Sequence, residues 1–595
     1  MSLSDLCIQR PVFATMLVAA LLVLGAFSYK DLGVDLFPKV DLPNIVVTTR
    51  FAGAGPEEVE TQITKVIEEA VNTISGIDEL RSSSFEGISQ VVVVFKLNRD
   101  PSDCAQDVRD RVGRILAKLP DGVEPPIIEK FDPDAAPVIS VVVASPWPHK
   151  ELTEFAKKRI KESIESVPGV GQVNMVGGRE REVHVNLDSD RLRALGVTPH
   201  DVKEALKRQN LEVPGGLVET GPRDMVLRTI GRVGRVEDFR KVVVKEVGGT
   251  LIRMEDLAAV TDAEQEQRTM ARLDGTNAVA LIVQKQSGTN TVQVVAAVKQ
   301  RLEELKAIVP SEVKLETVRD QSRFILAAFH AVMEHLILGA LLASLVVYLF
   351  LGNMRSTLIA AVAIPTSVIS TFTLMRFYDF TLNQMSLLAL ALAVGLVIDD
   401  AIVVLENIFR HIDERGSTPM AAASEATREI ALAVMATTLS LVVIFLPVAF
   451  MPGIIGRFFK AFGLTMTFSI LVSMLVSFTL TPMMCSRFLR RKGEGKGHGG
   501  SGGLDWFHSR IQSAYLALLG RSLKHRFVVV IAAGLCIVST VPILKIVGKD
   551  FIPFDDQSEF LINIKAPEGT SIQSTGKILS DIERRLRGLG NVEKV

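Results

Sequence analysis

Two adjacent aspartates, Asp399 and Asp400, lie in a long apolar run at about residues 384–405. A charge at the centre of a bilayer costs roughly 3 kcal/mol or more, so membrane helices normally exclude it. Carboxylates in such a run are therefore expected to have a function, and proton exchange is the chemistry open to them. We predict that the pair loads and releases protons to drive transport. The structural alternative is an ion pair with another membrane helix.

Other polar residues near the aspartates are candidates for supporting this chemistry. Thr437, Thr438 and Ser440 lie in the next apolar run and could hydrogen-bond the acids, although most hydroxyls in membrane helices bond their own helix. Glu406 is expected at the membrane interface. Neighbouring residues point about 100° apart on a helix, yet both acids can still face a bundle interior with Gly395 close above. They should then titrate as a coupled unit.

Composition excludes several classes of protein. The chain has 595 residues, 48% of them apolar, and a formal net charge of −1, so it is too long for one domain and nothing indicates a nucleic-acid partner. We find no hydrolase motif, nucleotide-binding loop or metal-ligand run, and predict neither an enzyme nor a cofactor, with the proton as coupling ion. Soft-metal transport needs grouped thiolates or thioethers. The methionines of the soluble part are instead scattered and the cysteines imply no disulfide framework: Met175, Met225, Met254, Met270, Cys7, Cys104, Cys485 and Cys536.

Seven apolar runs are long enough to cross a bilayer as helices. Lys and Arg are denser near one set of span ends, which predicts that this side is cytoplasmic and that the soluble block lies outside, in a periplasm. A cleaved signal peptide is the alternative for the first run, but a similar run with similar flanks recurs later. The expected spans are residues 11–29, 335–351, 357–375, 385–405, 430–450, 461–484 and 527–546.

The block between the first two spans predicts two units with the order β-α-β-β-α-β. In the first, strands at 44–51, 79–84, 89–97 and 127–131 alternate with helices at 56–74 and 102–119, with Ser102 as N-cap. In the second, an insertion at 188–267 with a projecting hairpin at 213–222 separates the two halves. The second unit has strands at 138–144, 173–176, 182–187, 278–284 and 313–318, and helices at 150–167 and 291–308.

A basic and then Gly-rich stretch, residues 487–503, predicts a flexible linker after the sixth span. The following residues 505–520 are amphipathic and could lie flat on the membrane or pack against a partner. Their shared apolar face would hold Trp506, Phe507, Ile511, Ala514, Leu518 and Leu519.

The chain contains an internal repeat. The sequence Gly-Val-Asp-Leu-Phe-Pro follows the first span at 33–38, and Gly-Lys-Asp-Phe-Ile-Pro follows the seventh at 548–553. A strand at 560–564 and a helix at 570–586 are expected next, as after the first copy. We therefore expect a truncated parallel repeat, in a chain that is a fragment of a protein nearly twice as long.

From Leu6 to its end the chain resembles the N-terminal part of a resistance–nodulation–division (RND) transporter of the hydrophobe/amphiphile efflux branch. The resemblance is carried by Arg10-Pro11, by the motif at 33–38, and by Gly-Leu-Val-Ile-Asp-Asp-Ala-Ile-Val-Val-Leu-Glu-Asn at 395–407. It implies a multi-pass α-helical membrane protein with an α+β periplasmic domain of tandem ferredoxin-like porter subdomains. The implied domains are a first transmembrane helix (1–30), a first porter subdomain (31–134), a second porter subdomain (135–187 and 268–325), a docking-type insertion (188–267), transmembrane helices 2–6 (330–487), a cytoplasmic linker with an amphipathic helix (488–526), transmembrane helix 7 (527–547), and the start of a second-half porter subdomain (548–595).

The resemblance also implies function and partners. It implies a proton antiporter in the bacterial inner membrane, a homotrimer that works with a periplasmic adaptor and an outer-membrane channel to export small amphiphilic or hydrophobic compounds. Asp399 and Asp400 match the family's proton-relay acids, whose lysine partner lies in later spans beyond Val595, so this chain alone should not pump. The strands at 138–144 and 173–176 carry no phenylalanine, which predicts reduced aromatic contact with substrates.

Three other functions stay open on the sequence. One is a metal-ion exporter of the RND family, and another is a protein-export accessory subunit of the same superfamily. The third is a sterol or lipid sensor without transport, against which the repeated soluble halves and the acid pair weigh.

Overall fold

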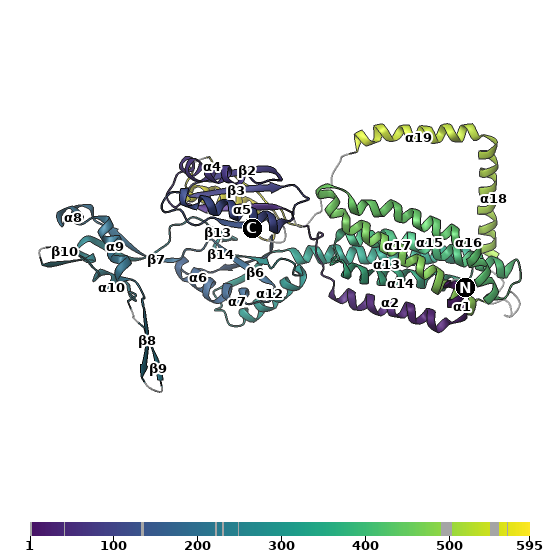
Figure 1. The fold of residues 1–595 in the computed structure, drawn as a ribbon, viewed down its shortest axis with the longest axis horizontal. Coiled ribbons are helices and arrows are strands. Elements are labelled where there is room, and N and C mark those ends of the chain that lie inside the picture. Colours follow the sequence, from purple (N-terminus) through teal and green to yellow (C-terminus); the bar gives the residue numbers. More distant parts are fainter. Residues whose placement is uncertain are drawn as a thin grey trace. The chain divides into compact units, whose positions relative to one another are not determined.

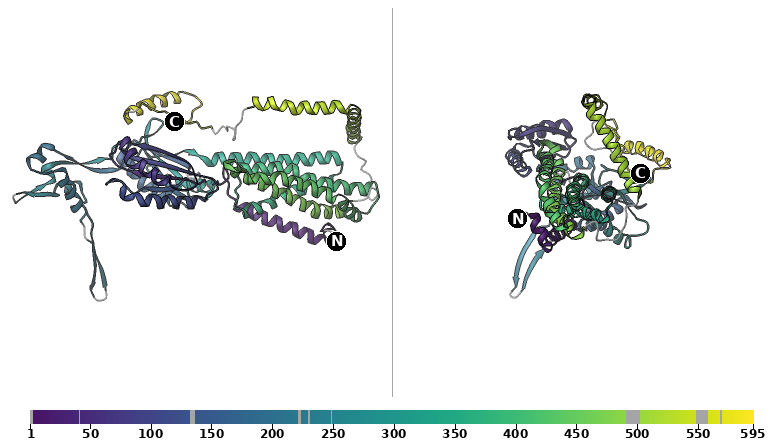
Figure 2. Two further views of the ribbon diagram at one scale, coloured as in Figure 1. Left: turned by 45° about the horizontal axis from the view of Figure 1, so that its top comes forward. Right: turned by 90° about the vertical axis from the view of Figure 1, so that its right-hand side faces the viewer.

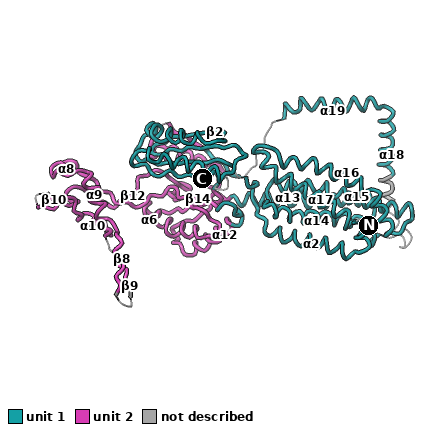
Figure 3. The backbone as a smooth tube through the Cα atoms, viewed as in Figure 1, with its two compact units in different colours: residues 1–136, 286–293, 321–562 teal, residues 137–285, 294–320, 563–595 magenta. Residues whose placement is uncertain are grey.

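The structure, a computed structural model, describes residues 3–40, 42–131, 136–220, 223–228, 231–247, 249–489, 502–547, 558–567 and 569–595. The chain forms two compact units (Figure 3). Unit 1 holds residues 1–136, 286–293 and 321–562, and unit 2 holds residues 137–285, 294–320 and 563–595. Most of the predicted linker (490–501) and the second copy of the repeated motif (548–553) lie outside the described residues.

Unit 1 contains the long apolar helices. Within the described part of the chain, seven helices are long and apolar enough to cross a membrane, and each overlaps one of the seven expected spans but most extend beyond it. Helices α13 to α17 lie side by side (Figure 1), and the most extensive contact is between α15 and α17. The seven helices are α2 (Pro11–Asp31), α13 (Gln321–Leu351), α14 (Met354–Phe377), α15 (Gln384–Asp413), α16 (Pro419–Phe445, continued by a 3₁₀ turn to Phe450), α17 (Gly453–Phe488) and α19 (Arg526–Ile546). Two further helices are α1 (Leu3–Gln9) and α18 (Gly502–Lys524).

Unit 1 also contains an antiparallel four-stranded sheet with the strand order β2-β3-β1-β4. Alternate residues of β1 and β3 point to a buried layer, as the alternating sequence predicts, and pack with the helices that connect the strands. The observed order of elements is β-α-β-β-α-β. These elements are β1 (Asn44–Arg50), α3 (Pro56–Val59), a π turn (Glu60–Thr64), α4 (Lys65–Val71), β2 (Ile77–Phe85), β3 (Ile88–Phe95), α5 (Pro101–Ile115) and β4 (Ile127–Lys130).

The start of α5 differs from the prediction. Asp100, not Ser102, is the N-cap, and its carboxylate accepts hydrogen bonds from the backbone N–H groups of Ser102 and Asp103. Pro101 occupies the first helical position, where a missing N–H costs nothing. The helix therefore begins before Ser102, and the Ser102 hydroxyl instead accepts a hydrogen bond from Lys130.

Unit 2 contains a second antiparallel sheet, in which β14 lies between β6 and β5, and β15 pairs with the other edge of β5. Its core packs against the helices that connect these strands. The elements are β5 (Pro137–Ala144), α6 (His149–Phe155), a π turn (Ala156–Lys161), α7 (Glu162–Glu165), β6 (Val170–Val176), β13 (Ala271–Leu273), β14 (Thr276–Lys285), α12 (Thr291–Lys306) and β15 (Lys314–Asp320).

Strand β7 (Arg181–Leu187) was expected in this sheet, but it pairs with β12 (Ala258–Glu264) instead. Val183 and Val185 of β7 pack against the core of the inserted residues. This burial favours pairing with β12 over pairing within the second sheet. In two views the hairpin β8–β9 extends well beyond the other elements of this insertion (Figure 2). The inserted elements are α8 (Ser189–Ala194), α9 (Pro199–Gln209), β8 (Pro214–Thr220), β9 (Arg223–Arg228), α10 (Val236–Arg240), β10 (Val243–Val247), β11 (Thr250–Arg253) and α11 (Met254–Leu257).

The C-terminal part of the chain corrects another expectation. The predicted strand at 560–564 is wrong: these residues form no strand in the structure, and the side chains of Phe560 and Leu561 are largely exposed. A strand needs a neighbour to take its backbone hydrogen bonds, and none of the described segments pairs with this one. The predicted helix is present as α20 (Ile572–Arg587), capped by Ser571.

Candidate proton site in the membrane helices

Helix α15 places the two aspartates near its middle. The helix begins after Asn383, whose side chain accepts hydrogen bonds from the backbone N–H groups of Met385 and Ser386, and this cap stabilises the helix end. Its apolar face packs into a core shared with α13 and α14. Burial of that face fixes the rotation of α15, and with it the directions of both carboxylates.

Asp400 is partly buried and points toward α16. The Thr438 hydroxyl is fully buried and lies 3.2 Å from each carboxylate oxygen of Asp400. It also lies 2.7 Å from the carbonyl oxygen of Val434. The hydroxyl has one proton, so it donates either to the carboxylate or to the carbonyl. A protonated Asp400 could in turn donate to the hydroxyl, so two hydrogen-bond arrangements fit the same atoms.

Asp399 points about 100° away from Asp400 around the helix axis and is exposed in the described structure. It lies one turn from Gly395 on the same helix face, where a Cβ at Gly395 would meet no described atom within 4 Å. Leu392 and Val403 are exposed on this face too. The described helices therefore enclose Asp400 only in part and leave the Asp399 face open, contrary to the expectation that both acids face the interior.

The structure brings Thr438, but not Thr437, to the acids. Thr437 is exposed and its hydroxyl bonds the carbonyls of Ala433 and Val434. Ser440 likewise donates to the carbonyl of Ala436 on its own helix. Consecutive residues diverge by about 100°, so one of two neighbouring threonines is bound to miss the carboxylate.

Sequence reasoning missed two polar contacts along α15. The Ser473 hydroxyl of α17 donates to the Val397 carbonyl at 2.8 Å. Farther along, the buried His411 ring lies 2.7 Å from Glu429 of α16. Spacing along one helix cannot reveal these partners, because each lies on another helix.

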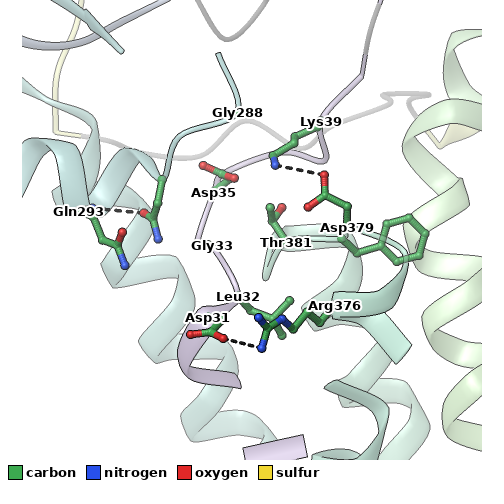
Figure 4. Close-up of a pocket in the computed structure, with 12 residues that line it drawn as sticks. Asp31, Leu32, Gly33, Asp35, Lys39, Gly288, Gln293, Arg376, Asp379 and Thr381 are labelled. Carbon is green, nitrogen blue, oxygen red and sulfur yellow. Dashed lines mark hydrogen bonds and ion pairs between the residues drawn. The ribbon is translucent and has the colours of Figure 1, made fainter. Parts of the chain in front are cut away.

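A polar cavity of about 310 Å³ lies where α2 and α14 end (Figure 4). Arg376 pairs with Asp31 at 2.5 Å, and Lys39 lies 3.7 Å from Asp379. The backbone on either side is tied by a parallel β-bridge between Val34 and Leu382. The repeated motif at 33–38 thus forms part of a joint between two helix ends, a role that its spacing did not indicate.

Among the described residues, no group of three or more His, Cys, Asp or Glu side chains could hold a metal ion. Met254 is buried in the core of the insertion and Met175 of β6 packs against the core beneath the second sheet, while Met225 is exposed on the hairpin. The described geometry places the partly buried Asp400 carboxylate in hydrogen-bond contact with the Thr438 hydroxyl.

Comparison with known proteins gives a match over nearly the whole chain. Residues 3–595 match the model of the AcrB/AcrD/AcrF family. A protein named "Multidrug resistance protein MdtC" from Proteus mirabilis is 33% identical over 605 residues, which cover 100% of this chain and 58% of the relative. Proteins of the same name from Pantoea ananatis and Salmonella arizonae are 34% identical over 588 residues and 33% identical over 585 residues. They cover 97% and 98% of this chain, and 56% and 57% of the relatives.

These matches bear on the expectation of a fragment. The family match covers nearly the whole chain, residues 3–595. The chain spans about 56–58% of the length of these curated relatives.

Proposed function

Because the chain belongs to the AcrB/AcrD/AcrF family of RND transporters, we propose that it is the permease of a proton-driven exporter. Its cargo would be small amphiphilic or hydrophobic compounds, and it would not be an enzyme. The relatives carry the name of multidrug resistance proteins, which favours this cargo over metal ions. The observation that carries the proposal is the contact between Asp400 and Thr438 within two membrane helices.

Proton uptake at Asp400 would change the packing of α15 against α16. An ionised carboxylate in this surrounding draws the Thr438 proton toward itself and away from the Val434 carbonyl. Once protonated, Asp400 has lost its charge and donates a hydrogen bond to the Thr438 hydroxyl, which then donates its own hydrogen bond to the Val434 carbonyl. Such an exchange biases the bundle only if its two states bind the proton differently. One elementary charge crossing 100 mV supplies about 2.3 kcal/mol for this bias.

Asp399 would complete the proton relay from the other side of α15. Its face is open toward space that the described helices do not fill. A cationic group on a further helix there would balance the carboxylate while Asp399 is ionised. The relay would then use both acids, with Thr438 supporting one of them and Thr437 neither.

The α+β parts would carry the substrate on the periplasmic side of an inner membrane. The strand orders β2-β3-β1-β4 and β6-β14-β5-β15 support the interpretation of both as ferredoxin-like porter subdomains. The domain division expected from the sequence is part of this proposal, except that β7 belongs with β12 in the insertion. The β8–β9 hairpin would reach a second copy in a homotrimer, and an adaptor and an outer-membrane channel would continue the path.

Direct chain connections would couple proton uptake in the membrane helices to substrate movement through the α+β parts. Strand β15 ends at Asp320 and α13 begins at Gln321, with no loop between them. The proposal requires that a shift of α13 reach the porter sheet through this direct chain connection. The two-residue connection between α13 and α14 would pass the shift on to α14 as well.

Proteoliposomes with an imposed proton gradient test the proposal. We expect Asp400→Asn to abolish the proton flux that accompanies substrate movement, because Asn cannot exchange a proton. Glu406→Gln, an exposed carboxylate on the same helix, is the matched control and should retain the flux. Substrate-linked proton flux that survives Asp399→Asn and Asp400→Asn together would contradict the mechanism.

A further inference from the structure

The polar cavity of about 310 Å³ lies at the level where two membrane-spanning helices end (Figure 4). Its walls come from the end of α2 with the motif that follows it, from the connection between α14 and α15, and from residues 288–293 at the start of α12, all within unit 1. The cavity therefore lies at the boundary between apolar spans and polar residues. Since ligand pockets hold about 300–1,000 Å³, this one suits a small polar group better than a drug-sized molecule.

The cavity wall carries charges of both signs. Two cations, Lys39 and Arg376, lie among three carboxylates, those of Asp31, Asp35 and Asp379. The side chains of the pairs Asp31–Arg376 and Lys39–Asp379 are 31–92% exposed, and exposed ion pairs contribute little to stability. A bound ion can therefore share these partners at little cost. The wall offers cations to a phosphate group and carboxylates to an ammonium group.

Gly33 leaves a space that polar groups surround. A Cβ added there would lie 3.5 Å from the Thr381 methyl group, 3.8 Å from the Asn290 amide nitrogen and 3.8 Å from a carboxylate oxygen of Asp35. The side-chain oxygen of Asn290 caps α12 by accepting hydrogen bonds from two backbone N–H groups, which fixes the amide so that its nitrogen lies toward the space. An alanine at position 33 would make only ordinary contacts but would occupy this space.

Thr381 adds a hydrogen-bond donor to the same wall. Its side chain lines the cavity (Figure 4), although the residue is only 5% exposed. The hydroxyl accepts a hydrogen bond from the Asn383 side chain at 3.1 Å and donates to no acceptor among the described residues. Because a hydroxyl can accept and donate at once, its proton remains available to an oxygen atom of a ligand.

Aromatic side chains lie at the same helix ends. Tyr29 of α2 is exposed, and so are Phe377 and Tyr378 at the end of α14. Phe380 of the cavity wall stacks on Tyr378, with ring centroids 6.0 Å apart. Amphipathic aromatic rings gather at the head-group level of membranes, and ring faces attract cations. These rings indicate that the cavity lies at the level of lipid head groups.

We propose that this cavity binds the head group of a zwitterionic phospholipid that carries a phosphate and a primary ammonium group. The Arg376 guanidinium, whose planar fork matches phosphate, and the Thr381 hydroxyl would bind phosphate oxygens. Asp35 and Asp379 would accept hydrogen bonds from the ammonium group, which has three donors. A quaternary ammonium has none, so phosphatidylethanolamine fits this wall better than phosphatidylcholine. The bound lipid would hold the ends of α2 and α14 together, and its binding is independent of the proposed proton coupling.

Thermal unfolding of the purified full chain in detergent tests the choice of lipid. A ligand that binds only the folded state raises the unfolding temperature as its concentration rises. Dioctanoyl phosphatidylethanolamine should do so at an at least about tenfold lower concentration than dioctanoyl phosphatidylcholine or phosphatidylglycerol, because neither of these can donate from a primary ammonium group to the carboxylates. Equal effects of the three lipids would overturn the proposal.

O-phosphoethanolamine, which has the same polar group without acyl chains, distinguishes a lipid from a small soluble ligand. We expect it to stabilise the chain far less than the lipid at equal concentration, because it gains nothing from the membrane helices. Stabilisation as strong as that by the lipid would overturn the assignment of a lipid as the ligand.

Substitutions in the wall locate the site. Gly33→Ala, Thr381→Val and Arg376→Ala should each raise the phosphatidylethanolamine concentration needed for half of the full stabilisation at least about tenfold, since each removes space or a donor to the phosphate. Lys30→Ala is the control, because Lys30 lies in the last turn of α2 but outside the cavity wall. Should Arg376→Ala fail to fold, Gly33→Ala still decides, because its new contacts are unstrained. Unchanged binding in the wall variants, or an equal loss in Lys30→Ala, would show that the lipid binds elsewhere.

Discussion

The Thr438 hydroxyl is the residue-scale feature with the sharpest consequence. It reaches both oxygens of Asp400, whereas Thr437 bonds only its own helix. Because a hydrogen bond to a charged group is worth about 1.5–3 kcal/mol, we expect Thr438→Val to reduce proton-coupled transport about tenfold or more. Thr437→Val should have no such effect. Equal losses in the two variants, measured as proton flux in proteoliposomes, would show that the contact with Asp400 does not matter.

A second prediction concerns Asp262, where three charges join β7, β12 and α6. Hydrogen bonds from Arg181 and then Lys150, at 2.8 and 2.6 Å, lower the pKa of the Asp262 carboxyl. A lowered pKa in the folded state means that the stabilisation is fully present above the ordinary value of about 3.9. It is lost as the pH falls through the folded-state pKa.

We therefore expect Asp262→Asn to lower the thermal unfolding temperature at pH 7 and pH 5. The difference from the unchanged protein should disappear as the pH falls below the folded-state pKa. Asp190→Asn is the control, since Asp190 is highly exposed and its ion pair with Arg193 is long, at 3.8 Å. A destabilisation by Asp262→Asn that is as large in strong acid as at neutral pH would argue for a packing role instead.

At the candidate site, the two aspartates could be predicted from the sequence, but the side chains that contact them could not. An aspartate pair in an apolar run is visible from composition alone, and so is the list of nearby hydroxyls. The choice of Thr438 over Thr437, and the separation of Asp399 from Asp400, depend on how α15 and α16 are rotated against each other.

At the scale of elements, α2 and α14 approach closely at one glycine. A Cβ added to Gly25 would lie 2.0 Å from the carbonyl oxygen of Ile369. Small residues let membrane helices pack backbone to backbone, so Gly25→Ala must push the helices apart. We expect a destabilisation of about 1–3 kcal/mol, typical of overpacking, seen as a lower unfolding temperature in detergent.

Gly339 of α13 provides the matched control for this substitution. No described atom lies within 4 Å of a Cβ placed there, so Gly339→Ala should be neutral or slightly stabilising. If Gly25→Ala unfolded at the same temperature as Gly339→Ala, the α2–α14 contact would not be as close as the structure shows.

Local sequence signals predicted most elements because each carries its own period. The seven apolar runs, and strands such as β1 and β3, follow directly from length and alternation. The wrong predictions concern which strand pairs with which, because this depends on segments far away in the sequence. The sequence pattern of β7 correctly predicts a strand. The strand nevertheless pairs with β12, because Val183 and Val185 pack against the core of the insertion. The segment at 560–564 has a strand pattern without a neighbouring strand.

At the scale of the whole molecule, the C-terminal helix α20 packs against strands about three hundred residues earlier within unit 2. Arg272 contacts Ser580 and lies 3.7 Å from Glu583, which also pairs with Arg587. Glu583 is only 8% exposed, and Gly576 lets Met270 approach the helix. This contact holds a segment that follows the seventh membrane helix against one that precedes the second.

We expect Arg272→Ala to loosen α20, because Glu583 would keep only one of its two cationic partners. A hydrogen bond to a charged group is worth about 1.5–3 kcal/mol, so amide hydrogen exchange in α20 should accelerate about tenfold or more. Arg584→Ala is the control, because Arg584 is exposed and pairs only with Asp581 on the same helix in the described structure. Exchange in α20 that was unchanged by Arg272→Ala, or changed equally by Arg584→Ala, would mean that packing around Met270 and Gly576 holds the helix without the charges.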